Sequence, residues 1–143
     1  MQIVYSYFVL DIVHRGHLLM LKNSKAIAGS DGRLIVGIVS DEAVEAAKGR
    51  PPLLSFSERL ELAQSIRYAD LVVRQDEYSP LNNVRKINPT ILMESDSHSE
   101  TQIYESRKCM EDIGGTVFVM PYFQGQSSTK IKELAAKTLQ KKE

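Results

Sequence analysis

Two histidines flank a glycine in the stretch His14-Arg15-Gly16-His17. The stretch follows an apolar segment typical of a strand and precedes an amphipathic segment typical of a helix. A helix start offers backbone N–H groups and a partial positive charge, which suit a phosphate group. Imidazoles add hydrogen-bond donors that are neutral or cationic near neutral pH, and Gly16 has no side chain to keep phosphate from the backbone. We therefore expect His14, Gly16 and His17 to bind phosphate.

Two other interpretations of the histidine pair are open. A His-x-Gly-His tetrapeptide is compatible with an ordinary surface turn, and a histidine pair can also bind a metal ion. The metal interpretation lacks a third ligand at fixed spacing, because the remaining histidine, His98, is distant in the sequence. The position between a strand and a helix favours the phosphate site, and no metal ligands are predicted.

A second group with suitable chemistry is the stretch GQSSTKIKEL at residues 125–134. Gly125 begins a turn, and three hydroxyl residues, Ser127, Ser128 and Thr129, precede an amphipathic helix. Hydroxyl groups and exposed amides at a helix start can hold an anion. The alternative is an ordinary helix cap without a ligand.

Basic residues form a third group. Lys48 and Arg50 lie on a predicted loop that two prolines close, and a cation on such a loop can cover a phosphate. Arg59 lies in the helix that follows, and Arg67 lies near its end. In the alternative interpretation Lys48 faces water, and the two arginines only pair with nearby acids: Glu58, Glu61 or Asp70.

The elements that must position these groups alternate along the chain as strands and helices. The predicted strands are apolar runs with no polar alternation, as in strands covered on both faces: residues 2–10, 33–39, 71–73, 90–93 and 116–120. The predicted helices are amphipathic: residues 16–28, 41–47, 57–65, 81–87, 99–113 and 128–141. Ser57 is the predicted cap of the third helix, and Ser127 or Ser128 that of the last. This order predicts an α/β fold, a Rossmann-like parallel five-stranded sheet with helices on both faces.

Composition limits the classes of function. The 143 residues are 43% hydrophobic, which fits one domain over residues 1–143. Eighteen basic and eighteen acidic residues cancel, so no overall field favours nucleic acid or a membrane surface, and neither is a predicted partner. The single cysteine, Cys109, cannot form an internal disulfide, and no secretory signal or membrane-spanning run is evident. We expect a cytoplasmic protein.

Several motifs in one order carry a resemblance to a known superfamily. These are the His14-to-His17 stretch, Lys48 with residues 55–59, IRYADLVV at residues 66–73, and GQSSTKIK at residues 125–132. Together they resemble the nucleotidylyltransferase superfamily over residues 5–134, with the small glycerol-3-phosphate cytidylyltransferases as the simplest comparison. Residues 77–93 and 114–129 are also similar to cytidylyltransferase domains of phosphonate biosynthesis.

The resemblance implies a reaction. A phosphate or phosphonate monoester attacks the α-phosphorus of a nucleoside triphosphate, predicted to be CTP, and pyrophosphate leaves. Such enzymes form no covalent intermediate, so alignment and charge stabilisation provide the catalysis. Magnesium enters with the triphosphate, held mainly by phosphate oxygens and water. The family also implies a homodimer.

The resemblance further implies roles for single residues. His14 and His17 hold the triphosphate and stabilise the transition state, and Lys48 reaches the α-phosphate or the acceptor. The other predicted nucleotide-binding residues lie at the first strand end, near residue 67, after the fourth strand and before the last helix: Phe8, Val9, Asp11, Gly16, Arg67, Asp96, Gly125, Ser127, Ser128 and Thr129. The segment around Arg67 also resembles a dimer contact.

Three departures from the family pattern affect this carry-over. Phe8, Val9 and Leu10 replace Gly-Thr-Phe before Asp11, so we expect a rearranged phosphate subsite or a shifted triphosphate. After the fourth strand, MESDSHS (residues 93–99) keeps only Asp96 of the usual Gly-Asp-Asp-Trp, which affects base recognition. Tyr122 replaces an arginine that contacts phosphate.

Two alternative functions follow. The chain could use ATP, as do superfamily members that make coenzyme A precursors, FAD, NAD or nucleotide-activated sugars. It could also be a nucleotide-binding module without turnover, because the segment before Asp11 is altered. In either enzyme, residues 48–55, 75–83 and 94–100 are expected to recognise the acceptor.

Overall fold

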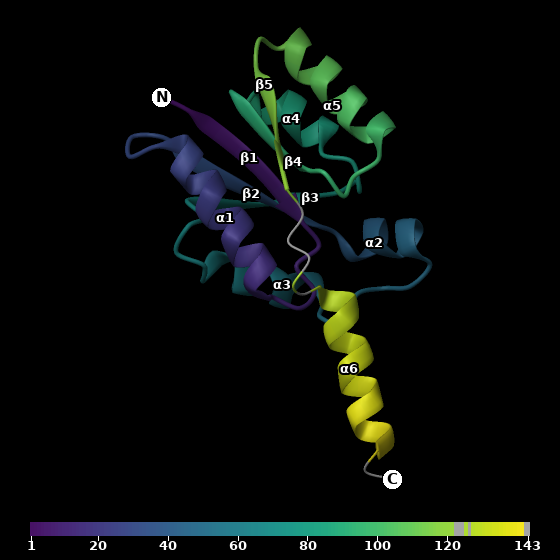
Figure 1. The fold of residues 1–143 in the computed structure, drawn as a ribbon. Helices are drawn as coiled ribbons and strands as arrows, with labels where there is room; N and C mark the ends of the chain where they lie inside the picture. The colour runs from purple at the N-terminus through teal and green to yellow at the C-terminus, as the bar shows by residue number, and fades with distance from the viewer. Residues whose placement is uncertain (122–124, 126, 142–143) are drawn as a thin grey trace.

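The computed structural model describes residues 1–121, 125 and 127–141. Five parallel strands form one sheet in the order β3-β2-β1-β4-β5, which confirms the predicted parallel sheet (Figure 1). Their bounds are β1 Ile3–Phe8, β2 Arg33–Val39, β3 Leu71–Gln75, β4 Ile91–Ser95 and β5 Thr116–Met120. The order reverses between β1 and β4, and the crevice beyond the carboxyl ends of these strands is where α/β sheets bind ligands.

Helices cover both faces of the sheet, as predicted (Figure 1). Their bounds are α1 Arg15–Ala28, α2 Asp41–Lys48, α3 Phe56–Gln64, α4 Leu81–Ile87, α5 Glu100–Asp112 and α6 Ser128–Lys141. Helices α1 and α3 pack on one face, and α4 and α5 lie on the other. Helices α2 and α6 lie beyond the carboxyl ends of the strands, beside the predicted site.

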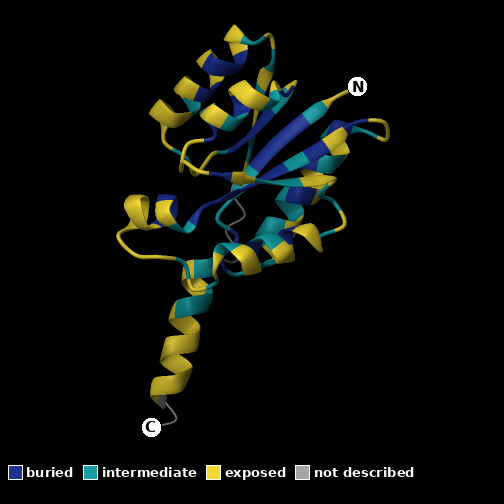
Figure 2. Cartoon of the chain, turned by 180° about the vertical axis from the view of Figure 1, so that it is seen from behind, coloured by how far each residue is buried: buried dark blue, intermediate teal, exposed yellow. Residues whose placement is uncertain are grey.

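Each face of the sheet has its own core, because successive strand residues point to opposite sides. Val4 on β1 packs with Leu21 of α1, whereas the next residue, Tyr5, packs with Val84 of α4 and Met110 of α5. The central strands are accordingly the most buried part of the chain, drawn dark blue in Figure 2. The continuous apolar strands of the sequence are explained by this burial on both sides.

Every helix begins and ends within one residue of its predicted bounds, but the predicted cap of α3 is wrong. Ser55, and not Ser57, caps this helix, because its Oγ accepts a hydrogen bond from Glu58 N at 3.3 Å. The helix therefore begins at Phe56. Helix α2 continues through Lys48, one residue further than predicted, and ends at Gly49 with a φ of 78°, a conformation that favours glycine. Ser127 Oγ accepts from Lys130 N at 3.1 Å and caps α6.

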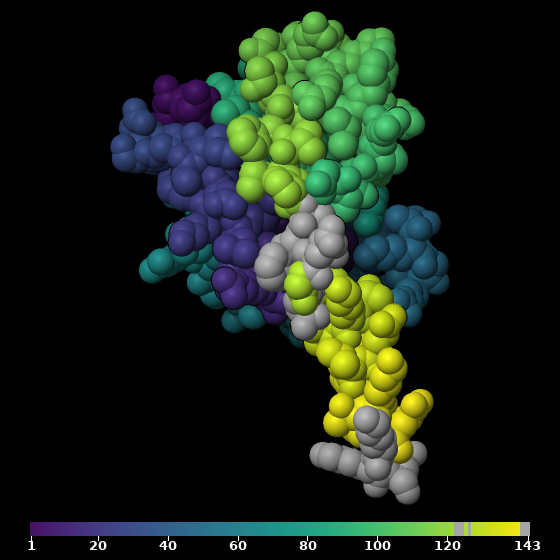
Figure 3. Space-filling model, viewed as in Figure 1, coloured from purple at the N-terminus to yellow at the C-terminus, as the bar shows by residue number. Residues whose placement is uncertain are grey.

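Helix α6 extends away from the sheet and its covering helices (Figure 3). Only its first turns contact the rest of the molecule among the described residues. Ser128 Oγ donates to Ile12 O at 2.9 Å, and Lys132 Nζ lies 2.5 Å from Asp11 Oδ2. Within the described part of the chain, no helix combines the length and apolarity needed to cross a bilayer.

Candidate active site

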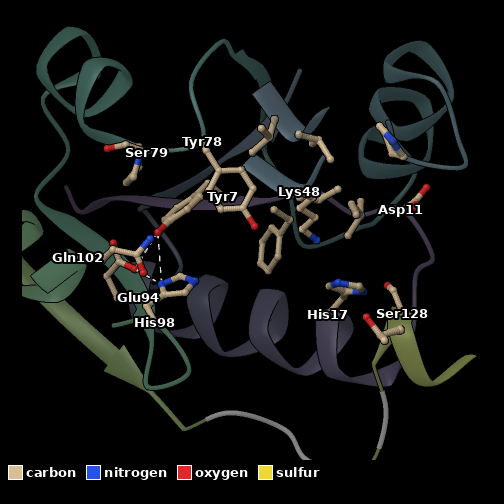
Figure 4. A pocket seen from close by; sticks show the side chains of 18 of the residues that line it. Tyr7, Asp11, His17, Lys48, Tyr78, Ser79, Glu94, His98, Gln102 and Ser128 are labelled. Atoms are coloured by element: carbon tan, nitrogen blue, oxygen red, sulfur yellow. Dashed lines mark hydrogen bonds and ion pairs between the residues drawn. The ribbon is translucent and has the colours of Figure 1, made fainter. Parts of the chain in front are cut away.

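Two adjoining cavities lie at the carboxyl ends of β1 and β4. The first has a volume of about 520 Å³ and the second of about 530 Å³, within the range of small-molecule sites. Both are lined by the same set of residues where they meet: Tyr7, Phe8, His17, Lys48, His98, Ser128 and Thr129. Figure 4 shows the Lys48 amine and the His17 ring approaching each other there.

The histidine pair forms the start of α1. His14 Nδ1 accepts a hydrogen bond from Gly16 N at 3.0 Å, and His17 Nδ1 accepts one from His14 N at 3.2 Å. The two ring centroids are 4.0 Å apart. Because both Nδ1 atoms accept backbone hydrogen bonds, the neutral rings carry their hydrogen on Nε2. Two N–H donors are thus available for a ligand at the helix start.

Burial makes these donors neutral groups at neutral pH. Burial, together with the charge on the neighbouring His14 ring, lowers the pKa of His17 to about 4. Burial also lowers the pKa of His14. Both rings therefore enter the site as neutral hydrogen-bond donors, ready for a ligand that brings negative charge.

The departure at residues 8–10 has a clear structural counterpart. The Phe8 ring meets the His17 ring edge to face, with centroids 5.8 Å apart, and forms part of the wall of both cavities. Leu10, which is buried, has a φ of 60°, in the left-handed region that costs a non-glycine residue about 1–3 kcal/mol. Phe8 thus supports the catalytic candidate His17 where the family pattern has a glycine.

Asp11 connects three segments around the first cavity. Its carboxylate accepts hydrogen bonds from Leu53 N at 3.0 Å, Leu54 N at 2.8 Å and Lys132 Nζ at 2.5 Å. Burial alone raises the pKa of Asp11, but these hydrogen bonds outweigh it, and the pKa is lowered. Asp11 lines the first cavity, and its contacts hold the loop after α2 and the start of α6.

The hydroxyl cluster reaches the same cavity as the histidine pair. Ser127, Ser128 and Thr129 line the second cavity together with His14 and His17. The Ser128 hydrogen bond to Ile12 O fixes the start of α6 beside the loop that leads to α1. Two helix starts that are more than one hundred residues apart in the sequence therefore face one space, and both suit phosphate groups.

Lys48 is a cation at the junction of the two cavities. It is exposed, lines both, and has no ionic partner among the described residues. It lies on the last turn of α2 and not on the predicted loop. Arg50 and Val9 line the first cavity, and Gly16 lines the second.

Arg59 has a different role from the pairing expected from its sequence neighbours. Its side chain is fully buried and donates to Val9 O at 2.7 Å, Val39 O at 2.7 Å and Leu54 O at 3.1 Å. Its ion pair is with Asp41, at 2.7 Å. Arg59 therefore joins the carboxyl ends of β1 and β2, and the pairing with Glu58, Glu61 or Asp70 is wrong.

Several predicted residues are not brought to the cavities. Arg67 lies before β3, at the opposite edge of the sheet, where its guanidinium is 5.1 Å from the centre of the Tyr68 ring. Its placement in the nucleotide site is not supported, and its dimer contact stays a prediction. Asp96 follows β4, and Gly125 precedes α6, but neither is among the described residues that line these two cavities. Tyr122 lies outside the described residues.

A polar cluster at the end of the first cavity was missed. Glu94 and His98 line it with Tyr7, Tyr78 and Gln102, as Figure 4 shows. The spacing of an acid and a histidine four residues apart after a strand was the available signal. Each of the three segments expected to recognise the acceptor contributes residues to the lining of this cavity: Lys48, Arg50, Pro51, Pro52, residues 78–81, Glu94 and His98.

The described residues form no group of three or more histidine, cysteine or acidic side chains that could hold a metal ion. Asp11 is the carboxylate nearest in sequence to the histidine pair, and both of its oxygens already accept hydrogen bonds. A magnesium ion bound mainly through phosphate oxygens and water stays a prediction.

Comparisons with known proteins agree with this geometry. Residues 9–134 match the family described as Cytidylyltransferase-like. The chain is 30% identical over 122 residues to the FAD synthase of Korarchaeum cryptofilum, covering 85% of this chain and 82% of that protein. It is also 30% identical over 131 residues to the bifunctional protein HldE of Gluconobacter oxydans, covering 91% of this chain but only 26% of HldE.

A solved structure shares the fold. The crystal structure of the lipopolysaccharide core biosynthesis protein from Thermoplasma volcanium superposes with a TM-score of 0.71 at 24% identity. The match covers 88% of this chain and 99% of that one. The arrangement of strands and helices described above is therefore shared by nearly the whole of that protein.

Proposed function

Since this chain belongs to the cytidylyltransferase-like family, we propose that it transfers a nucleoside monophosphate from a nucleoside triphosphate to a small phosphate or phosphonate monoester. One observation carries the proposal. The two cavities meet at His17, Lys48 and Ser128, so two ligands, one in each cavity, would have their phosphorus groups at the same junction. Such proximity supplies much of the rate enhancement in a transfer without a covalent intermediate.

In the proposed step an acceptor oxygen forms a bond to the α-phosphorus, the bond from that phosphorus to the bridging oxygen breaks, and pyrophosphate leaves. The Nε2–H groups of His14 and His17 donate to phosphate oxygens as charge develops. Lys48 points into the junction and places a positive charge beside the reacting groups. Ser127, Ser128 and Thr129 hold the departing phosphates at the start of α6. A bound magnesium ion would neutralise part of the triphosphate charge.

The nucleoside is proposed to occupy the second cavity. Its walls include Phe8, Met20, Met93 and Met120, and methionine side chains adapt well to a flat ring. Ser95, Asn23 and Ser97 add hydrogen-bonding groups. The family resemblance favours CTP. The similarity to a FAD synthase supports ATP as a second candidate, because FAD contains an adenylate.

Pyrophosphate release tests the proposal. The protein is incubated with magnesium and either CTP or ATP, together with a panel of phosphate and phosphonate monoesters. The proposed enzyme releases pyrophosphate only when an acceptor is present and joins the nucleotide to it, as mass spectrometry of the product shows. Binding of a nucleotide without release for any acceptor would instead identify a binding module.

Two asparagine variants separate the donors from the helix start. His14→Asn and His17→Asn each keep a side-chain oxygen that can accept the backbone hydrogen bond now made to Nδ1, but they lack the Nε2–H group. We expect both variants to fold as the wild type and to lose transfer by at least about a hundredfold, the usual effect of removing one such donor. Full activity in both would remove the histidine pair from the mechanism.

A further inference from the structure

A polar cluster that the proposed transfer does not use lies at the end of the first cavity. The Glu94 carboxylate is buried, with 1% of the residue exposed. It accepts hydrogen bonds from the Tyr7 hydroxyl at 2.8 Å, the Ser106 hydroxyl at 2.8 Å and His98 Nδ1 at 2.5 Å. Three elements and one loop thus combine to hold one imidazole ring in a fixed orientation.

These contacts define which nitrogen of His98 carries the hydrogen. Because a carboxylate oxygen accepts hydrogen bonds, Nδ1 is the donor in this pair, and the Nδ1–H tautomer of His98 has a free electron pair on Nε2. The Nε2 atom of the ring points toward the middle of the cavity, in the direction of Lys48 and His17 (Figure 4). His98 therefore offers an acceptor, whereas His14 and His17 offer donors.

Three neutral polar side chains also line this end of the cavity: Tyr78, Ser79 and Gln102. Tyr78 and Ser79 contribute hydroxyl groups to the lining. Gln102 Oε1 accepts from Ser99 N at 3.0 Å, which directs its hydrogen-bond capacity toward donation by the amide N–H groups. A ligand with hydroxyl groups could therefore form hydrogen bonds with the His98 acceptor, the Gln102 amide donor and the neighbouring hydroxyl groups.

A cationic ligand fits this cluster less well. Both oxygens of Glu94 already accept hydrogen bonds, and the Tyr7 ring stacks between Tyr5 and His98, with centroids 6.5 Å and 5.7 Å away. The Glu94 carboxylate is therefore already engaged, and the Tyr7 ring already has stacking partners. Glu105 lines the cavity but is exposed, where water and salt screen its charge.

We propose that His98, oriented by Glu94, determines acceptor specificity by accepting a hydrogen bond from a hydroxyl group on the acceptor's carbon skeleton. The inference rests on the proposed function and narrows its acceptor to a hydroxylated phosphate or phosphonate monoester. The phosphate end of this acceptor lies at the junction with Lys48, and its hydroxylated end lies at His98. Glu94 is a positioning residue that acts through His98.

The hydrogen position is tested first, on the ligand-free protein. The chain has three histidines, so ring nitrogen resonances of ¹⁵N-histidine-labelled protein are assigned with one variant per residue. Near neutral pH we expect His98 as the Nδ1–H form and His14 and His17 as Nε2–H forms. Glu94→Gln removes the negative charge beside Nδ1, so in this variant we expect a mixture of the Nδ1–H and Nε2–H forms of His98. An Nε2–H form of His98 in the wild type overturns the proposal.

Matched ligands test the hydroxyl contact. The probes are glycerol 3-phosphate against n-propyl phosphate, and glucose 1-phosphate against cyclohexyl phosphate, with CTP or ATP present and magnesium left out. In at least one pair we expect the hydroxylated probe to bind about twofold to about tenfold more tightly, the effect of one neutral hydrogen bond, and to shift the His98 Nε2 resonance. Equal binding within both pairs contradicts the proposal.

Two substitutions of His98 complete the test. His98→Phe keeps a ring against Tyr7 but has no Nε2, so the preference for the hydroxylated probe disappears. His98→Gln offers an amide oxygen near the position of Nε2, so it should recover part of the preference for the hydroxylated probe. An unchanged preference in His98→Phe overturns the proposal, because the ring alone then accounts for the selectivity.

The outcome is independent of turnover, because all three measurements report on structure or binding. A wild type that selects hydroxylated probes through His98 but never releases pyrophosphate contradicts the proposed function and keeps the His98 contact. Pyrophosphate release without any dependence of probe binding on His98 contradicts this inference alone.

Discussion

Replacement of Arg59 by leucine is expected to destabilise the whole fold. The guanidinium is fully buried and donates to the carbonyl oxygens of Val9, Val39 and Leu54, besides its ion pair with Asp41. These carbonyls belong to the ends of two central strands and to the loop before α3. Leucine fills part of the space but donates nothing, so the buried carbonyls lose their partners.

The size of the effect follows from these contacts. A buried acceptor left without a partner costs about 1–3 kcal/mol, and removal of one member of a buried charged network costs about 3–5 kcal/mol in total. Asp41 is partly exposed, so water can hydrate its carboxylate after the arginine is removed, and the loss of this ion pair costs less. We therefore expect Arg59→Leu to lower the free energy of unfolding by about 4 kcal/mol, measured by urea denaturation followed by circular dichroism.

Arg74 provides a matched control. It also forms ion pairs, with Glu42 and Asp76, and its guanidinium also lies near the Phe56 ring, but nearly half of its side chain is exposed. Exposed pairs of this kind contribute about 1 kcal/mol or less, so Arg74→Leu should barely change stability. Equal losses in Arg59→Leu and Arg74→Leu would refute the role assigned to the buried contacts.

Three further predictions concern the site. The pKa of His17 falls from its ordinary 6.5 to about 4 on folding, so the folded state binds fewer protons and stability decreases as pH falls through this window. Wild type should lose roughly 2 kcal/mol more than His17→Asn between pH 7.5 and pH 5 in urea titrations, and equal losses contradict the shift. Lys48→Ala should lower kcat by about a hundredfold or more while nucleotide Kd changes little; unchanged kcat removes Lys48 from the mechanism. Lys132→Met removes the ion pair that holds the start of α6 to Asp11, and it should weaken triphosphate binding in calorimetry. Lys137→Met, on the exposed part of α6, is the control. Equal triphosphate affinities of the two variants would contradict the role of the ion pair in holding α6 at the site.

Local sequence signals were sufficient for the fold and for the parts of the site at element ends. Strands buried on both faces appear as apolar runs, and the positions of His14, His17 and Ser128 follow from where a strand ends or a helix begins. The carboxyl edge of a parallel sheet then brings such ends together. In the structure both helix starts line the second cavity, although more than one hundred residues separate them in the sequence.

Side chains whose partners are distant in the sequence could not be predicted in this way. Arg59 looks like a helix-surface residue, and only the folded chain places it against the carbonyls of Val9, just after β1, and of Val39 on β2. Glu94 and His98 likewise acquire their meaning from Tyr7 on a neighbouring strand. Arg67 was assigned to the site by a motif resemblance, and it lies before the amino end of β3 and lines neither of the two cavities.

The most direct test is a crystal structure of the protein with a non-hydrolysable α,β-methylene analogue of CTP or ATP. Our account requires the β- and γ-phosphates beside Ser127, Ser128 and Thr129, and the α-phosphorus beside the Nε2 atoms of His14 and His17. A triphosphate bound with its phosphates away from either helix start would contradict it.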